Sequence, residues 1–391
     1  MNQIKILHTA DLHLGGKLTG LGPAGEKRAI EKFQLFLQML RWLDQNNIEI
    51  FLIAGDFFEG QCPSKIWRSV QEEFRKRPNL WVFIAPGNHD YNSIDSPYRE
   101  EGWPENVKIF QGPMERIDLV SKKVSVFGCG FTASFEKRAF DQTADWAALV
   151  EGPGKGDPDW INLGLFHGEI TSKEGASPYN PIHPPAWPKD LFTYVGLGHI
   201  HKPTPLSYEG KTAYAYSGAP FGSGFDETGN RGFYAGKITP YKAALDFIQL
   251  EPARFYRFDV DLTGASSSLD IQICIQEALE EKEEMRKNYY RLYLRGALNP
   301  EIKIDPQWLA SLFEGKTAYL EIIDQTHPAL DLKEESEKST LLGFFVRGIL
   351  AREKKLEDFS SSSPSKGRDK RILDQALTLG LKAFYEEGGF S

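Results

Sequence analysis

Two near-continuous apolar runs constrain the fold of this chain more than any other feature of its sequence. Residues 48–54 (IEIFLIA) run up to Asp56, and residues 80–85 (LWVFIA) run up to Asn88. Runs of this kind are typical of strands buried on both faces, as in a parallel sheet covered by helices. The stretch 63–77 lies between them and begins with proline, which favours the first turn of a helix.

The segment before these runs repeats the pattern. Residues 3–10 (QIKILHTA) alternate, are rich in β-forming residues and stop at Asp11. From about Glu26 to Asn46, apolar residues recur at helical spacing. The order is therefore β-α-β-α-β, with polar residues just past each strand. Because ligands of open α/β sheets bind at the carboxyl ends of the strands, we expect the functional site there.

The pattern changes between about residue 107 and residue 251. Short apolar stretches separated by tight turns replace the long helices, which is typical of strands joined by short connections. We expect these strands to pair antiparallel in a second sheet. The predicted strands are 107–110, 115–120, 123–128, 161–166, 193–197, 203–208, 212–216 and 232–238.

A shift in composition near Glu251-Pro252 marks a domain boundary. We expect one domain over 1–252 and a small α/β unit over 253–330 that could pack as a lid. Residues 331–391 predict a helical segment, with two helices around a flexible Ser-rich linker at 360–367. The elements predicted in the small domain are strands 255–262, 289–295 and 317–323, a helix at about 268–286 and a short helix from Pro306.

The composition is that of an ordinary globular protein, with 41% hydrophobic and 26% charged residues. No stretch approaches the roughly 20 apolar residues of a membrane span. The three cysteines are far apart and fit a reducing compartment, so we expect a cytoplasmic protein with no membrane association. The net charge of −8 weakens, without excluding, a protein that grips nucleic acid.

Five motifs at the predicted strand ends carry the chemistry. Imidazoles and carboxylates are ligands for Mn, Fe or Zn, and an Asn carbonyl favours a harder ion such as Mn. One carboxylate can bridge two ions about 4 Å apart, the separation used in two-metal hydrolysis. A single histidine is more often a surface or hydrogen-bonded residue, but five motifs in order predict a metal site. They are Asp11-x-His13, Gly55-Asp56, Gly87-Asn88-His89-Asp90, His167-Gly168 and Gly198-His199-x-His201.

The other three histidines are assigned no ligand role. His8 lies on the first predicted strand and is interpreted as a buried structural histidine. His183 lies in a Pro-rich loop, where a surface position is the better interpretation, and His327 lies in a connector.

The motif series resembles that of the calcineurin-like metallophosphoesterases, D-x-H, G-D, G-N-H-[DE], H and G-H-x-H. The resemblance implies the α/β fold class, as a four-layer α/β/β/α sandwich, and a site for two divalent metal ions. It also implies the ligand sets: Asp11, His13, Asp56 and His201 for one ion, and Asp56, Asn88, His167 and His199 for the other. Asp56 would bridge the ions. His89 would donate a proton or hydrogen bond to the leaving oxygen, and Asp90 would orient His89.

Further segments resemble the SbcD-type exonuclease subunits of DNA double-strand-break repair. These are His8 to Gly15, the stretch 55–58, and the stretch 216–232 with its sequence FDETGNRG. The resemblance implies a Mn²⁺-dependent DNA exonuclease or endonuclease that hydrolyses phosphodiester bonds at double-stranded ends. It also implies that 1–252 is the catalytic domain, that 253–330 is a capping domain that recognises DNA, and that the protein is a homodimer that pairs with a coiled-coil ABC-type ATPase. The C-terminal helices are where we expect this ATPase to dock, and a helical pair packed on its own domain is an equally good interpretation of them.

One position departs from that pattern. Some family relatives carry a histidine three residues after the bridging aspartate, where this chain has Glu59. Apart from this departure, two alternatives stay open: a phosphodiesterase or phosphomonoesterase for small molecules such as nucleotides, and a scaffold that kept the fold but lost catalysis. The complete ligand set argues against the second.

Overall fold

The computed structural model describes residues 2–60, 62–137, 140–171, 177–250, 253–282, 284–299, 301–358 and 366–386. The chain forms two compact units, Met1–Arg254 and Phe255–Ser391. None of the described helices is long and apolar enough to cross a membrane.

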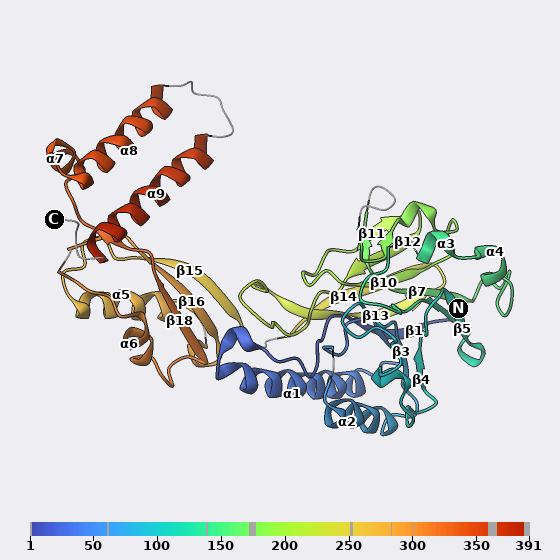
Figure 1. Ribbon diagram of the computed structural model, residues 1–391. Coiled ribbons are helices and arrows are strands. Elements are labelled where there is room, and N and C mark those ends of the chain that lie inside the picture. Colours follow the sequence, from blue (N-terminus) through green and yellow to red (C-terminus); the bar gives the residue numbers. More distant parts are fainter. Residues whose placement is uncertain are drawn as a thin grey trace. The chain divides into compact units, whose positions relative to one another are not determined.

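The first unit contains a six-stranded sheet in the order β14-β13-β1-β2-β3-β4. Strands β1 to β4 pair parallel, so the predicted β-α-β-α-β order is confirmed. The bounds are β1 (Ile4–Thr9), β2 (Ile50–Ile53), β3 (Trp81–Ile84), β4 (Val107–Ile109), β13 (Arg231–Thr239) and β14 (Lys242–Leu250). Helices α1 (Ala24–Gln45) and α2 (Ser64–Arg75) lie along one face of this sheet (Figure 1).

Both faces of the first sheet are buried, as its apolar runs predict. On β2, Phe51 and Ile53 pack with α1 and α2, while Ile50 and Leu52 pack against a second sheet. Burial of each large apolar side chain stabilises the fold by about 1.5–3 kcal/mol. The apolar side chains of β2 are therefore buried on both faces of the sheet, against helices on one face and against the second sheet on the other.

The second sheet has the order β11-β12-β10-β7-β6-β5. The prediction of antiparallel pairing is wrong for its centre, because β6, β7, β10 and β12 pair parallel and only β5 and β11 pair antiparallel. The bounds are β5 (Glu115–Leu119), β6 (Val124–Gly128), β7 (Ile161–His167), β10 (Tyr194–Gly198), β11 (Ser207–Glu209) and β12 (Thr212–Tyr216).

The connections explain the parallel pairing. Long segments link β6 to β7 and β7 to β10, and crossover connections of this length are what parallel neighbours need. They carry α3 (Phe140–Thr143) and α4 (Trp146–Leu149) and bury Phe166 and Val195 on the outer face of the sheet. The layers are thus helices, sheet, sheet, and short helices with loops, which is the predicted α/β/β/α sandwich.

Two strands predicted for the second sheet lie in the first. The stretch predicted at 107–110 forms β4, and the stretch predicted at 232–238 forms β13, which pairs antiparallel with β1. The sequence analysis also missed β14. The remaining short elements of this unit are η1 (Thr19–Leu21), η2 (Pro97–Arg99), η3 (Val120–Lys122), β8 (Glu169–Ile170), β9 (Pro181–Ile182) and η4 (Pro184–Ala186).

The second unit has a parallel three-stranded sheet of β15 (Phe255–Asp261), β16 (Tyr289–Arg295) and β18 (Tyr319–Asp324). Helix α5 (Ser268–Glu280) begins after Ser267, whose side chain accepts the backbone N–H of Asp270. Such a cap stabilises a helix by about 1 kcal/mol. The other elements are η5 (Met285–Lys287), β17 (Ala297–Leu298), α6 (Pro306–Ser311), β19 (His327–Pro328), α7 (Leu332–Glu337), α8 (Leu341–Asp358) and α9 (Lys366–Glu386).

The C-terminal part differs from its prediction in two ways. Two helices were expected, and the described residues contain the additional short helix α7. Residues 360–365 of the predicted linker 360–367 lie outside the described residues. Its last two residues, 366 and 367, belong to α9.

One buried histidine links the two sheets of the first unit. The His8 side chain on β1 is fully buried, and its Nδ1 lies 2.8 Å from the Tyr194 hydroxyl on β10. Burial lowers the pKa of His8 to about 3. The neutral ring therefore belongs to the folded state across the ordinary pH range.

We predict that His8 makes the first unit sensitive to acid. An unfolded histidine has a pKa of about 6.5. Between this value and the folded value the unfolded chain binds more protons, so stability falls as pH falls. From pH 7 to pH 5 the loss from His8 amounts to about 2 kcal/mol.

The measurement is urea unfolding of the metal-free protein, followed by tryptophan fluorescence, for wild type and His8→Asn. Seven of the eight tryptophans precede residue 255, so the signal reports the first unit. Between pH 7 and pH 5, the free energy of unfolding of the variant should fall by about 2 kcal/mol less than that of wild type. Equal losses would show that His8 is not held neutral.

Candidate metal centre

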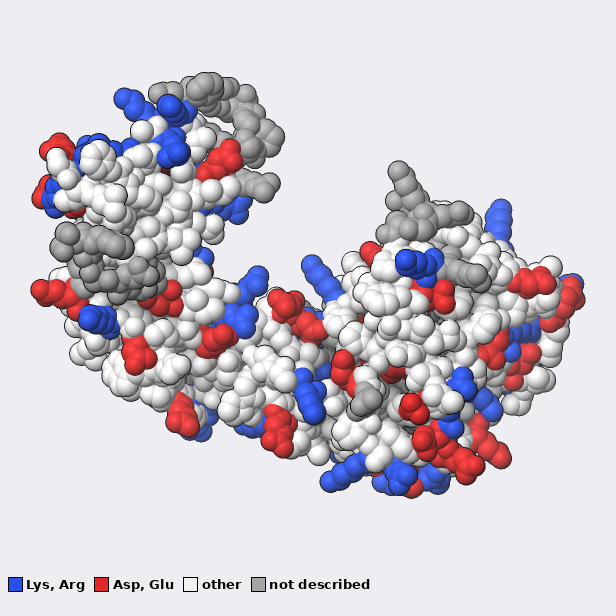
Figure 2. Space-filling view, viewed as in Figure 1, with Lys and Arg blue, Asp and Glu red and all other residues white. Residues whose placement is uncertain are grey.

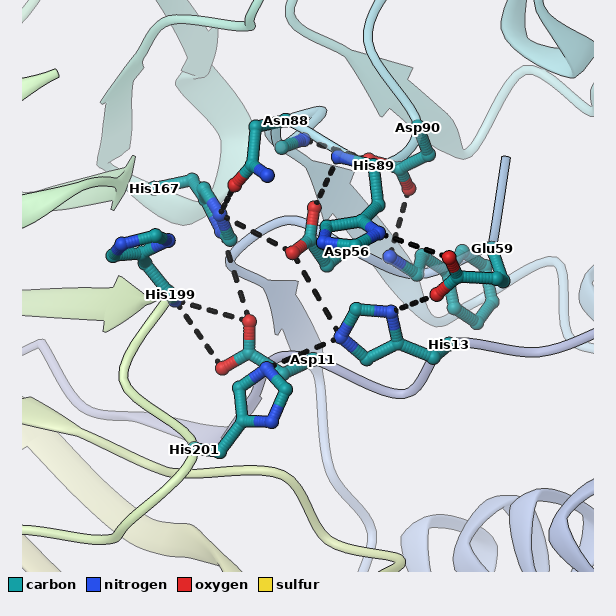
Figure 3. A network of polar contacts seen from close by, with 12 residues as sticks. Asp11, His13, Asp56, Glu59, Asn88, His89, Asp90, His167, His199 and His201 are labelled. Carbon is teal, nitrogen blue, oxygen red and sulfur yellow. Dashed lines mark hydrogen bonds and ion pairs between the residues drawn. The ribbon is translucent and has the colours of Figure 1, made fainter. Parts of the chain in front are cut away.

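The predicted ligands come from the carboxyl ends of five strands in two sheets. Asp11 and His13 follow β1, Asp56 follows β2, and Asn88 follows β3. His167 ends β7, and His199 and His201 follow β10. Figure 3 shows these side chains gathered around the carboxylates of Asp11 and Asp56.

The backbone at the site is held in an unusual conformation. Asp11, His13, Asp56 and His199 all have positive φ angles, between 46° and 101°. Residues other than glycine seldom adopt this region, and each such residue costs on the order of 1–3 kcal/mol. Hydrogen bonds between the first two loops stabilise it, from Asp11 N to the Gly55 carbonyl at 3.0 Å and from His13 N to the Asp56 carbonyl at 2.9 Å.

His13 and His201 form one half of the site. Their Nε2 atoms lie 3.2 Å apart, and ligand atoms of Asp11, His13, Asp56 and His201 all lie within 4.8 Å of one another. Two nitrogens that each lie about 2.1 Å from one ion are separated by roughly 3.0–3.4 Å. The observed separation is thus that of two ligands of one metal ion.

His167 and Asn88 form the other half. His167 Nε2 lies 3.1 Å from Asn88 Oδ1 and 3.5 Å from Asp56 Oδ2. The same Asp56 oxygen lies 3.8 Å from His13 Nε2, while Asp56 Oδ1 accepts the backbone N–H of His89 at 2.9 Å. One Asp56 oxygen therefore faces both halves, as a bridging carboxylate requires.

The histidine protons are directed away from the centre. His167 Nδ1 donates to the Ala54 carbonyl at 2.9 Å, His13 Nδ1 donates to Glu59 at 2.6 Å, and His201 Nδ1 donates to Glu227. Since each Nδ1 carries the proton, the Nε2 lone pair of each neutral ring is directed at the centre. Outer hydrogen bonds of this kind orient metal-binding histidines. The donor set fits two divalent ions.

The pKa shifts of Asp11 and Asp56 also agree with a site that holds cations. Burial raises the pKa of Asp11 well above its ordinary value. Burial also opposes ionisation of Asp56, but the attraction that the neighbouring histidine rings exert when protonated, together with the His89 backbone N–H, outweighs it and holds the pKa of Asp56 below its ordinary value. A cation held by Asp11 offsets the cost of burying its charge.

His199 is placed differently from the other ligand candidates. Its backbone N–H donates to both Asp11 oxygens, at 3.0 and 3.2 Å. Its ring packs 5.3 Å from the His167 ring and 4.8 Å from the Tyr179 ring. Among the described residues, no polar contact joins the His199 ring to the other predicted ligands, so its ligand role stays a prediction.

Asp90 makes different contacts from those expected of it. Asp90 was expected to orient His89, but Asp90 Oδ2 accepts the backbone N–H groups of Phe57 and Phe58, at 2.7 and 3.1 Å, and the Tyr98 hydroxyl. Its Oδ1 accepts the backbone N–H of Gly87 at 2.7 Å. The buried Asp90 carboxylate therefore ties the loops after β2 and β3 together, and this expectation is wrong.

The partner of His89 is Glu59. His89 Nδ1 lies 2.9 Å from Glu59 Oε1, and this hydrogen bond raises the pKa of His89 to about 9. The His89 side chain is 45% exposed, at the margin of the buried ligands. A protonated, accessible imidazole can donate a proton to a leaving oxygen.

Sequence reasoning assigned no role to Glu59 or Glu227. Glu59 appeared only as a departure from the family pattern, and Glu227 only as part of a resembling hairpin. Both carboxylates contact histidines, and hydrogen bonding from His201 outweighs burial to lower the pKa of Glu227 to about 2. The sequence signal that could have identified them is their position: Glu59 lies three residues after Asp56, and Glu227 lies within the stretch FDETG.

Comparison with known proteins agrees with this geometry. The family model of the calcineurin-like phosphoesterases matches residues 4–203, slightly more than half of the chain. The chain belongs to the calcineurin-like phosphoesterases. It is also similar to the uncharacterized metallophosphoesterase YhaO of Bacillus subtilis (strain 168), with 24% identity over 351 residues that cover 86% of this chain and 80% of the relative.

Membership makes this phosphoesterase a metal-dependent hydrolase of a family that uses a binuclear site. When bound, the ions would supply positive charge at the phosphoryl oxygens and an activated water. Of the predicted ligands, those whose polar atoms converge in the structure would hold them: Asp11, His13, Asp56, Asn88, His167 and His201. The chain itself would contribute the Asp56 carboxylate that faces both halves of the site, the tautomers of the ligand histidines and a proton from His89.

We predict that Asp90→Asn destabilises the first unit. The substitution puts an amide N–H₂ against backbone N–H groups that now share a carboxylate, and losing such charge-assisted bonds costs about 2–4 kcal/mol. Urea unfolding followed by tryptophan fluorescence measures the change. The control is Asp95→Asn, an exposed residue of the same loop, which should change stability by less than about 0.5 kcal/mol. Equal stability of the two variants would contradict the tying role of Asp90.

Proposed function

We propose that this phosphoesterase is a Mn²⁺-dependent DNA nuclease that hydrolyses phosphodiester bonds at double-stranded ends during DNA repair. The observation that carries the hydrolytic part is the half-exposed His89 ring beside the bridging Asp56. A phosphate held over Asp56 would bring its leaving oxygen next to His89. His89 would then donate its Nε2 proton as the bond to phosphorus breaks.

The choice of manganese rests on the ligand chemistry. The set combines carboxylates, imidazoles and the Asn88 carbonyl, and a mixed oxygen and nitrogen set suits Mn²⁺. No cysteine belongs to it, although thiolates are the ligands that favour Zn²⁺ most strongly.

The choice of DNA rests on segments outside the ligands. The stretch 216–232 resembles bacterial DNA repair exonucleases of the SbcD type, and Glu227 in this stretch contacts the ligand His201. The α/β part of the second unit has the size and the place in the chain of the capping domain in that group. We propose that it binds duplex DNA.

The C-terminal helices support a proposal about partners. Helices α8 and α9 expose large apolar side chains, including Phe344 at 62% and Leu379 at 69%. Lys and Arg gather near the end of α8 and the start of α9 (Figure 2), and the exposed ones among the side chains that the structure describes there are Arg352, Lys354, Lys355, Lys370 and Arg371. We propose that a coiled-coil ABC-type ATPase docks on these helices and that the protein acts as a homodimer.

One observation favours a second candidate, a phosphodiesterase or phosphomonoesterase for nucleotides. The chain carries a net charge of −8, and an acidic surface repels a polyanion more than a small substrate. The binuclear site would serve both functions. The substrate panel below separates them.

We predict Mn²⁺-dependent degradation of end-labelled linear duplex DNA. The assay runs with and without the coiled-coil ATPase, beside mononucleotides, cyclic nucleotides and aryl phosphoesters. Loss of labelled ends is the expected result. Hydrolysis of nucleotides with no cut in DNA in either condition would overturn the nuclease proposal and favour the second candidate.

We predict that His89→Ala lowers turnover of DNA by about 10²–10⁴-fold, the range for loss of a general acid. The metal content should remain two ions per chain, because the His89 ring lies outside the ligand pairs. Metal analysis by mass spectrometry checks this. A variant that loses both ions would contradict the assignment of His89 as a proton donor.

A further inference from the structure

Glu59 stands between a predicted metal ligand and the proposed proton donor. Its Oε2 lies 2.6 Å from His13 Nδ1, and its Oε1 lies 2.9 Å from His89 Nδ1. The two rings are nearly perpendicular, with centroids 4.9 Å apart. Figure 3 shows the carboxylate placed between them. Each oxygen thus serves one histidine.

The backbone fixes the position of Glu59 between the loops. Glu59 N donates to the Leu14 carbonyl at 3.0 Å, next to His13. Gly60 N donates to the His89 carbonyl at 3.1 Å. The residue is therefore anchored to the loop that carries His13 and to the loop that carries His89.

The contacts determine where each imidazole keeps its proton. A carboxylate only accepts hydrogen bonds, so both Nδ1 atoms must donate. The Nε2 lone pair of His13 is then directed at His201 Nε2, 3.2 Å away. For His89, the ring is held through Nδ1, and Nε2 stays free to carry the proton that is transferred.

In the part of the chain that the structure describes, no other carboxylate takes this place for His89. The Asp90 oxygens are occupied by three backbone N–H groups and the Tyr98 hydroxyl. Asp56 contacts residue 89 only through the backbone N–H. Among the described residues, Glu59 alone accepts a hydrogen bond from the His89 ring.

We infer that Glu59 is a positioning residue whose single carboxylate holds the Nδ1–H groups of both His13 and His89, and so couples metal binding to proton donation. The inference rests on the proposed role of His89 and on phosphoester hydrolysis, but not on DNA as the substrate. A histidine at this position offers one acceptor nitrogen and cannot serve both rings at once.

The test compares Glu59→Gln with a matched control. Gln keeps one carbonyl acceptor and presents an N–H₂ group to the other ring, which forces that ring to keep its proton elsewhere. The control is Glu49→Gln, because Glu49 is also a half-buried carboxylate that accepts two hydrogen bonds, from Lys5 N at 3.0 Å and Lys122 Nζ at 2.8 Å. The side chains of Glu49 and Glu59 are 35% and 37% exposed.

The activity readout is the dependence on the leaving group. Protonation by a general acid speeds the departure of an alkoxide, which is a poor leaving group. It speeds the departure of p-nitrophenolate little, because this weakly basic anion leaves readily without a proton. In Glu59→Gln, kcat should fall by about 10²–10³-fold for a dinucleotide and by less than about tenfold for a p-nitrophenyl diester, with KM unchanged. Glu49→Gln should change neither value. Equal falls on both substrates would overturn the coupling to His89.

The second readout does not need turnover. Calorimetric titration of the metal-free protein with Mn²⁺ should show affinity about 10–100-fold weaker in Glu59→Gln, the usual effect of losing an outer partner of a ligand. Nitrogen NMR above the pKa of His89, where its ring is neutral, should show the remaining proton on Nδ1 in wild type and redistributed in the variant. Unchanged Mn²⁺ affinity together with unchanged histidine tautomers would overturn the inference. Three bound ions in wild type and two in Glu59→Gln would also overturn it, because Glu59 would then be a metal ligand.

Failure of the nuclease proposal can be told apart from failure of this inference. If wild type cleaves no DNA or dinucleotide, the same leaving-group comparison uses glycerol phosphate and p-nitrophenyl phosphate. Glu59→His is the second variant, and it should lose one of the two contacts and show the same selective fall. A fall that is independent of the leaving group in both variants would contradict the inference.

Discussion

The close approach of the two sheets at their carboxyl ends is the constraint on which the site depends. A Cβ atom on Gly198, at the end of β10, would lie only 1.7 Å from the carbonyl oxygen of Ala54, just after β2. A Cβ on Gly55 would lie 2.2 Å from His167 Nδ1, and one on Gly87 would lie 2.2 Å from Asp56 Oδ1. Glycine at these three places lets ligands from both sheets reach one centre. The buried apolar faces between the sheets stabilise this approach, and the left-handed backbone at Asp11, His13 and Asp56 aims the side chains.

Outside the ligands, a second layer of acceptors gives the histidines their direction. Ala54, Glu59 and Glu227 accept hydrogen bonds from Nδ1 of His167, His13 and His201, so that the Nε2 atoms of these three rings are directed at the centre. Asp90 holds the loops rather than a histidine. The distribution of carboxylates therefore separates three tasks: Asp11 and Asp56 for the metals, Asp90 for the loops, and Glu59 and Glu227 for the rings. Because these carboxylates lie around the same few histidines, a substitution of one of the outer carboxylates also changes how the ligand side chains are oriented.

Much of this arrangement could be predicted from the sequence, and the part that could not has a physical cause. The apolar runs 48–54 and 80–85 have the strand signature, and the polar residues that follow them must meet at one sheet edge. The direction of pairing in the second sheet depends on long connections whose path no local pattern encodes, so β7 and β10 were expected to pair antiparallel. The wrong assignment of Asp90 has a similar origin. Adjacency to His89 in sequence suggested contact, whereas the fold brings in Glu59, 30 residues away.

Anomalous diffraction from crystals soaked in Mn²⁺ tests the binuclear centre most directly. The account predicts two peaks about 3.5–4 Å apart. One should lie between His13 and His201, the other beside His167 and Asn88, and both should lie against Asp56 Oδ2. A single peak, or two peaks that do not share this oxygen, would contradict it.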